Sequence, residues 1–148
     1  MLTAITFEEA LELTANLLNQ MESQQLDEVE IQDTITQLVA TENGARGFFV
    51  NYLTDQRSLA DQPSTGIITA LKTSPEIVSE LLVKNLAMST AMGMTHRRNQ
   101  DEKMAQGSDQ VLKRTLNLIQ KTKSDILTTK LQELQQTIEE FRYTIVIR

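Results

Sequence analysis

The chain has 148 residues, of which 40% are hydrophobic and 23% charged, with five glycines, two prolines and no cysteine. This length is typical of one domain with its own core, and the composition argues against disorder and against a disulfide scaffold. Few glycines, prolines and aromatic residues favour helices over strands. We therefore expect an all-α protein: a single helical domain over residues 1–148, built as a multi-helix bundle that ends in a long C-terminal helix.

Nothing in the hydropathy pattern indicates a membrane protein. Residues 1–6 lack the basic and apolar regions of a secretion signal, and no apolar run reaches the roughly 20 residues of a membrane span. The absence of cysteine suits a reducing compartment. We expect a cytoplasmic protein without membrane contact.

The net charge of −6 is unevenly distributed along the chain. Residues 1–62 carry eleven acids and two bases, whereas residues 63–148 carry nine acids and twelve bases, which gives −9 and +3. Such asymmetry can indicate binding to nucleic acid or membrane. We favour a simpler interpretation, in which the two halves pack on each other or on a second copy, because the pI of 4.8 opposes polyanion binding.

Three acidic helices are expected within residues 1–62. Thr6 and Glu9 form a capping-box pattern at the start of the first helix. A second helix begins near Asp27, and we expect it to end at 42–44, where Asn43 and Gly44 tolerate the left-handed conformation.

The third expected helix is short and holds most of the aromatic mass. Its apolar residues recur at helical spacing, which predicts that they fill the core: Ala45, Phe48, Phe49, Tyr52 and Leu53. Gly47 would let a neighbouring helix approach closely. Residues 55–65 are predicted to be a loop.

The long helices are expected over residues 75–148. Ser74, Pro75 and Glu76 form a strong helix start, and the apolar arc that follows is wide, which predicts a central position. Residues 95–103 are polar and either continue this helix or form the turn of a helical hairpin. We favour continuation, with the break at Gly107.

The last helix carries two apolar stripes that are offset across residues 122–125, which predicts a bend or break there. The second stripe steps by 4-3-4-3-4 and is a possible interface: Leu127, Leu131, Leu134, Ile138, Phe141 and Ile145. It is too short to predict a free-standing coiled coil, so an ordinary bundle helix is favoured. The β-branched tail, 143–147, offers one exception, a very short terminal strand paired with residues 2–5.

No catalytic, cofactor-binding or metal-binding residue is predicted. The position three residues before His96 is Gly93 rather than glutamate, so the di-iron motif of helical bundles is absent. Neither a Gly-x-Ser-x-Gly turn nor a glycine-rich phosphate loop occurs. An enzyme assembled from scattered carboxylates and His96 is the least favoured class.

One basic set is a candidate for binding an anion or an acidic partner: His96, Arg97, Arg98, Lys103, Lys113 and Arg114. Guanidinium groups match carboxylates and phosphates bidentately. The favoured alternative is a solvated turn whose arginines pair with Asp101 and Glu102. The set lacks interleaved aromatic residues, which disfavours nucleic acid.

The methionines near this set suggest a kind of ligand, since methionine-rich surfaces adapt to partners: Met88, Met92, Met94 and Met104. If they line a groove, an acidic amphipathic helix would be the complementary ligand, and it could belong to another copy. The sequence thus predicts a non-enzymatic helical protein-interaction or regulatory protein that self-associates, as a homodimer or larger homo-oligomer, or binds another protein. The alternative is a module that binds an anionic ligand or nucleic acid through the basic set.

Overall fold

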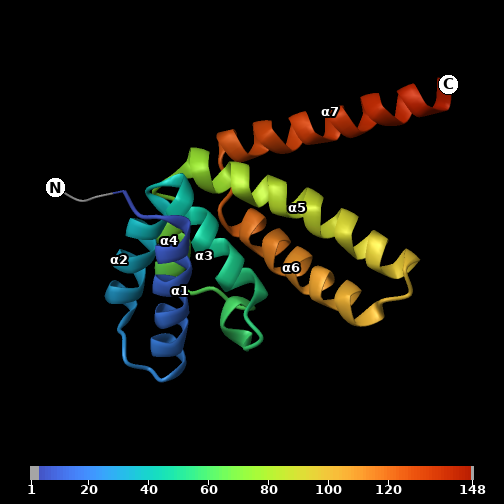
Figure 1. The fold of residues 1–148 in the computed structure, drawn as a ribbon. Helices are drawn as coiled ribbons and strands as arrows, with labels where there is room; N and C mark the ends of the chain where they lie inside the picture. The colour runs from blue at the N-terminus through green and yellow to red at the C-terminus, as the bar shows by residue number, and fades with distance from the viewer. Residues whose placement is uncertain (1–3, 148) are drawn as a thin grey trace.

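A computed structural model describes the backbone of residues 4–147 and the side chains of residues 4–141. Within this part of the chain there are seven α-helices, one short 3-10 helix and no strand (Figure 1). The prediction of an all-α, multi-helix protein is confirmed. None of the described helices is both long enough and apolar enough to cross a membrane.

Each of the first three helices begins at an N-cap residue whose side chain accepts a hydrogen bond from a backbone amide of the first turn. In α1 (Phe7–Glu22), the predicted capping box is present: the Glu9 amide donates to the Thr6 hydroxyl over 3.0 Å, and the Thr6 amide donates to the Glu9 carboxylate over 3.1 Å. A second capping box, which joins Asp27 and Glu30, opens α2 (Glu28–Val39). The short helix α4 (Thr65–Leu71) packs against α2.

The predicted end of the second helix at 42–44 is wrong. The second helix ends at Val39, and α3 (Glu42–Thr54) begins two residues after Ala40, with the Thr41 hydroxyl accepting from the Gly44 amide. Gly44 therefore lies inside a helix start and does not adopt a positive φ. Its lack of a side chain serves packing, because a Cβ there would lie 2.0 Å from the Leu38 carbonyl oxygen.

The aromatic residues of α3 fill the core, as predicted. Phe48 and Tyr52 are fully buried and stack with their ring centroids 4.9 Å apart. Burial raises the pKa of the Tyr52 hydroxyl above its ordinary value. Gly47 lets α1 approach α3 closely, since a Cβ on Gly47 would lie 2.5 Å from that of Ala10.

The predicted loop over 55–65 is largely confirmed and contains one turn of 3-10 helix, η1 (Ser58–Ala60). It leads through α4 to α5 (Pro75–Arg98), whose start has proline at the first turn as predicted, although the Ser74 side chain accepts no capping hydrogen bond. Its central position is also confirmed, because α5 contacts α3, α6 and α7.

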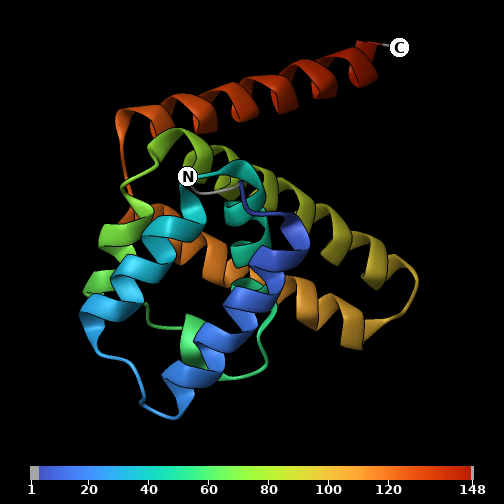
Figure 2. The ribbon, with the colours of Figure 1, turned by 60° about the vertical axis from the view of Figure 1, so that its left-hand side comes forward.

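The predicted helix break at Gly107 is wrong. The chain turns back at residues 99–101, so α5 and α6 (Glu102–Lys121) form an antiparallel hairpin that extends from the rest of the molecule (Figures 1 and 2). Gln100 makes this turn with a positive φ of 60°, and Asp101 caps α6 by accepting from the Met104 amide. Gly107 lies in the middle of α6.

The predicted break across 122–125 is confirmed, since α6 ends at Lys121 and α7 (Asp125–Ile147) begins after it. The strand suggested for 143–147 is wrong, because α7 is helical through Ile147. A strand needs a neighbouring strand to pair with, and the described residues offer none. Residues 2 and 3 of the suggested partner lie outside the described residues.

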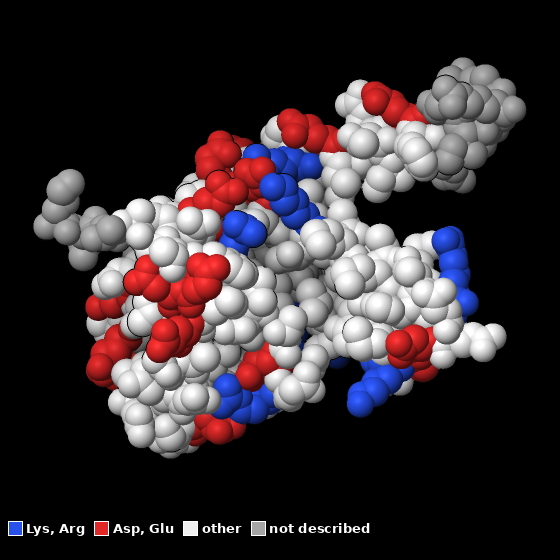
Figure 3. Space-filling model, viewed as in Figure 1, with Lys and Arg blue, Asp and Glu red and all other residues white. Residues whose placement is uncertain are grey.

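Acidic side chains gather over the part of the molecule formed by α1 to α3 (Figure 3). Among the described residues, one ion pair joins residues 1–62 to the rest of the chain, between Arg114 and Asp61. The acidic and basic halves are therefore not joined by a layer of ion pairs. Most of the negative charge of the first half remains at the surface.

Candidate functional site

The predicted basic set begins with a residue that the fold has enclosed. The Arg114 side chain is 2% exposed, and its Nε atom donates to Asp61 over 2.9 Å. Its two Nη atoms donate to the carbonyl oxygens of Leu53, Asp55 and Arg57 over 2.7 to 3.1 Å. These carbonyls lie at or just beyond the end of α3, where the helix dipole is negative and favours a cation. Arg114 thus joins α6 to α3 and is not available to a ligand.

Arg97 is also engaged, but on the surface. It donates to the Asp109 carboxylate and lies 3.7 Å from a carboxylate oxygen of Glu102, so it bridges the two helices of the hairpin. The hydrogen bond from Arg97 holds the pKa of Asp109 below its ordinary value. The alternative prediction, that the arginines pair with nearby acids, therefore holds for Arg97. Its partners are Asp109 and Glu102, and Asp109 takes the place of the predicted Asp101. Arg98 is exposed beside it.

The remaining members of the basic set lie in two different places. His96 and Lys103 line a hollow between α5 and α6, whereas Lys113 lines another hollow together with Asp61 and Lys121. The structure therefore does not bring the six residues together into one basic patch.

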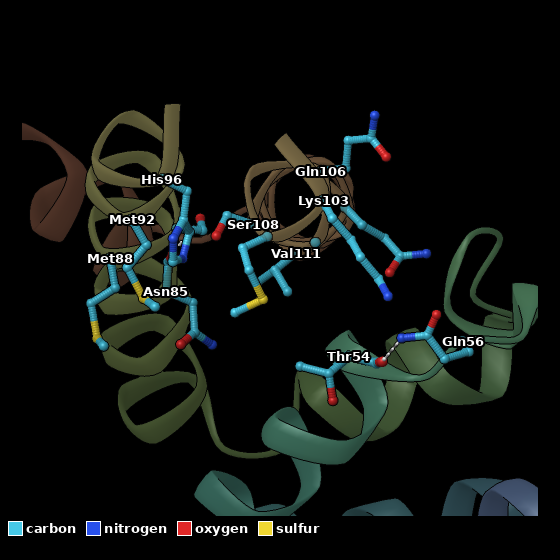
Figure 4. Close-up of a pocket in the computed structure, with 14 residues that line it drawn as sticks. Thr54, Gln56, Asn85, Met88, Met92, His96, Lys103, Gln106, Ser108 and Val111 are labelled. Atoms are coloured by element: carbon cyan, nitrogen blue, oxygen red, sulfur yellow. Dashed lines mark hydrogen bonds between the residues drawn. The ribbon is translucent and has the colours of Figure 1, made fainter. Parts of the chain in front are cut away.

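The hollow beside His96 forms one end of a groove, and its volume is about 710 Å³. Figure 4 shows its labelled side chains arriving from three places: α5, α6 and the segment that ends α3. The apolar part of its lining consists of Met88, Met92, Met104 and Val111. The three methionines are each about half exposed, which is unusual for large apolar side chains without a partner.

The groove continues along α5 into a second hollow of about 540 Å³. The two hollows share four lining residues: Thr54, Asn85, Met88 and Val111. Phe7, Val50 and Leu81 add apolar surface to the second hollow, and Arg46 and Lys84 add cations. We call the two hollows together the α5–α6 groove; along α5 its lining runs from Leu81 to His96.

Polar side chains also line the groove, among them Asn85, Ser89 and Ser108. The Nε2 atom of His96 is buried and has no hydrogen-bond partner within the described part of the chain. Among the residues that the structure describes, no group of three or more histidine, cysteine or acidic residues could hold a metal ion. The methionine-rich part of the lining is suited to binding an apolar surface.

The heptad stripe of α7 changes its environment along the helix. Leu127 is 1% exposed and Leu131 packs against the core, but Ile138 is 56% exposed and Phe141 67% exposed. The side chain of Ile145 lies outside the described residues. Both ribbon views show the reason for this change in exposure: the start of α7 lies along α5, and its later turns project beyond the rest of the molecule (Figures 1 and 2). We call residues 134–147 the distal part of α7.

Sequence reasoning identified the methionines and the heptad stripe but missed other residues of the groove. Thr54, Gln56 and Asn85 line it, yet they come from segments far apart in the sequence and share no motif with His96 or Lys103. No signal in a single sequence would have joined them. The groove exists only because the hairpin of α5 and α6 packs on the end of α3.

These features define an all-helical protein whose surface combines an apolar groove with a projecting, apolar-striped helix. A family model described as "Uncharacterised conserved protein UCP020893" matches residues 6–144, nearly the whole chain, and the chain belongs to this family. Comparisons with curated proteins and with solved structures gave no match.

Proposed function

We propose that this protein is a helical protein-interaction module that associates with a second copy of itself through the distal part of α7. One observation carries the proposal: a single heptad stripe is buried at Leu127 and two-thirds exposed at Phe141. An apolar stripe that continues past its own core is typical of a surface that another protein covers.

The projecting geometry supports this proposal over a purely structural role for α7. The first turns of α7 already anchor the helix to α5, and the ion pair between Lys130 and Glu76, 3.6 Å apart, lies in this anchored part. Ile138 and Phe141 add nothing to that contact, because they are exposed. Their burial against a partner would stabilise an assembly by about 2 kcal/mol for each side chain.

We do not extend the proposal to anionic ligands or nucleic acid. The basic residues divide between two places, and Arg97 and Arg114 already bind carboxylates. A site for a polyanion needs several unpaired cations on one surface. The cytoplasmic location stays a prediction from the sequence.

Replacing Ile138 by glutamate tests the proposal. Light scattering across a dilution series should give a mass that rises above the 16.7 kDa of one chain for the native protein. Ile138→Glu should weaken association by at least about 30-fold, because loss of one central anchor costs about 2 kcal/mol and a symmetric dimer contains two copies of it. Ile138 is exposed, so the helical content should not change.

Gln132→Glu is the matched control, since it adds the same charge to an exposed position about 120° around α7 from Ile138. It should leave association nearly unchanged. A native protein that stays at the mass of one chain at every concentration would refute the proposal, and so would equal effects of the two substitutions.

A further inference from the structure

The described part of the chain contains both a methionine-lined groove and a helix whose later turns project from its neighbours, and the lengths of the two agree. We infer that the distal part of α7 binds in the α5–α6 groove of a second copy, and that the exchange is reciprocal. This inference rests on the proposed self-association and names its two surfaces. It makes the groove the receptor and the heptad stripe its ligand.

The lengths of the two surfaces match. The groove follows α5 from Leu81 to His96, which at 1.5 Å per residue is about 22 Å. The distal part of α7, residues 134–147, extends for about 20 Å by the same measure. A helix of this length can contact both hollows of the groove at once.

The spacing of the apolar residues also fits a helix bound in a groove. Leu134, Ile138 and Phe141 follow the i, i+4, i+7 pattern by which amphipathic helices present anchors to such grooves. The receiving surface is rich in methionine, whose flexible thioether side chain adapts to the shape of a ligand. Val50 and Val111, whose branched side chains are less flexible than methionine, also line this surface.

Charge distinguishes this arrangement from direct pairing of two α7 helices. The distal part of α7 carries two acids, Glu139 and Glu140, against one base, Arg142, so two such helices packed in parallel would bring like charges together. The α5–α6 groove is lined by three cations, Arg46, Lys84 and Lys103, against one acid, Glu42, and Lys84 also lies 3.2 Å from Glu80 on α5. An acidic helix is therefore favoured in the groove and disfavoured against its own copy.

Reciprocal exchange would also limit the size of the assembly. If each copy inserts its α7 into the groove of the other, both grooves and both helices are used, and the assembly closes as a two-fold dimer. Insertion in one direction only would leave a groove and a helix unused at the ends and would produce chains of increasing length.

Cross-linking through engineered cysteines tests the inference, because the chain contains no cysteine of its own. Thr137→Cys lies beside the anchors of α7, and Ser108→Cys lines the groove; both are small, conservative changes. The two full-length variants are mixed, one of them isotope-labelled, and treated with a short bis-maleimide. Mass spectrometry then identifies which chains have been joined.

The mixed product of Thr137→Cys and Ser108→Cys should dominate, and its yield should fall when unlabelled native protein competes. The matched control is Gln120→Cys, an exposed position on α6 outside the groove. With Thr137→Cys it should react on the order of 10²-fold more slowly, since its thiol gains no effective concentration from the complex.

The other outcomes separate the inference from the proposed function. A dimer in solution that joins Thr137→Cys only to itself would overturn the groove as receptor and leave self-association standing. A native chain that stays monomeric and gives no mixed product would overturn both. A mixed product within masses that grow beyond a dimer would keep the groove and overturn reciprocal exchange.

Discussion

The guanidinium group of Arg114 donates four hydrogen bonds to the end of α3 and the loop that follows it. The acceptors are three backbone carbonyls and the Asp61 carboxylate. The sequence placed Arg114 with Lys113 in a candidate binding set, because guanidinium groups match carboxylates and phosphates bidentately. Their environments are opposite: Arg114 is buried and Lys113 is exposed. Helical geometry explains the difference, since consecutive residues point about 100° apart and only one of the two faces α3.

Replacing Arg114 by methionine should destabilise the protein by about 3 kcal/mol, because three carbonyl oxygens and Asp61 lose a charged donor. Urea unfolding would measure the change in free energy. Lys113→Met should change the stability by less than about 0.5 kcal/mol, as expected for an exposed position. Equal losses in the two variants would contradict the role assigned to Arg114.

At the scale of elements, the sequence predicted helix starts better than helix ends. Capping residues such as Thr6, Asp27 and Pro75 carry their chemistry locally, and all three mark real starts. The turn of the hairpin depends instead on Gln100, a residue that rarely adopts a positive φ. Backbone hydrogen bonds close this turn, with the amides of Gln100 and Asp101 donating to the carbonyls of Arg97 and His96, and such bonds leave no mark in the pattern of side chains.

Two of the glycines for which the sequence predicted a helix contact or a helix break, Gly47 and Gly107, should respond oppositely to substitution by alanine. Gly47→Ala would place a methyl group against Ala10 and should destabilise the protein by about 1 to 3 kcal/mol. Gly107→Ala meets no atom within 4 Å and should stabilise α6 by about 0.5 to 1 kcal/mol. Thermal unfolding of the two variants checks both signs, and a destabilised Gly107→Ala would contradict the continuous α6.

At the scale of the whole molecule, the sequence indicated the heptad stripe of α7 and the methionines of the α5–α6 groove. It did not indicate where either lies in the folded molecule. The heptad stripe was visible as a pattern, yet nothing in it distinguished the buried Leu127 from the exposed Phe141. That distinction arises because α7 diverges from α5 (Figures 1 and 2). The groove likewise joins three segments whose proximity is a property of the tertiary fold.

Amide hydrogen exchange of the native chain at low and high protein concentration tests the central claim most directly, that the distal part of α7 is a self-association surface. The account predicts that the amides of residues 134–147 exchange more slowly as the protein concentration rises. Burial of this part of α7 against a second copy suppresses the local unfolding through which its amides exchange. Protection of α2, which contributes no residue to the lining of the α5–α6 groove, should rise much less. Exchange in residues 134–147 that is independent of concentration would contradict the account.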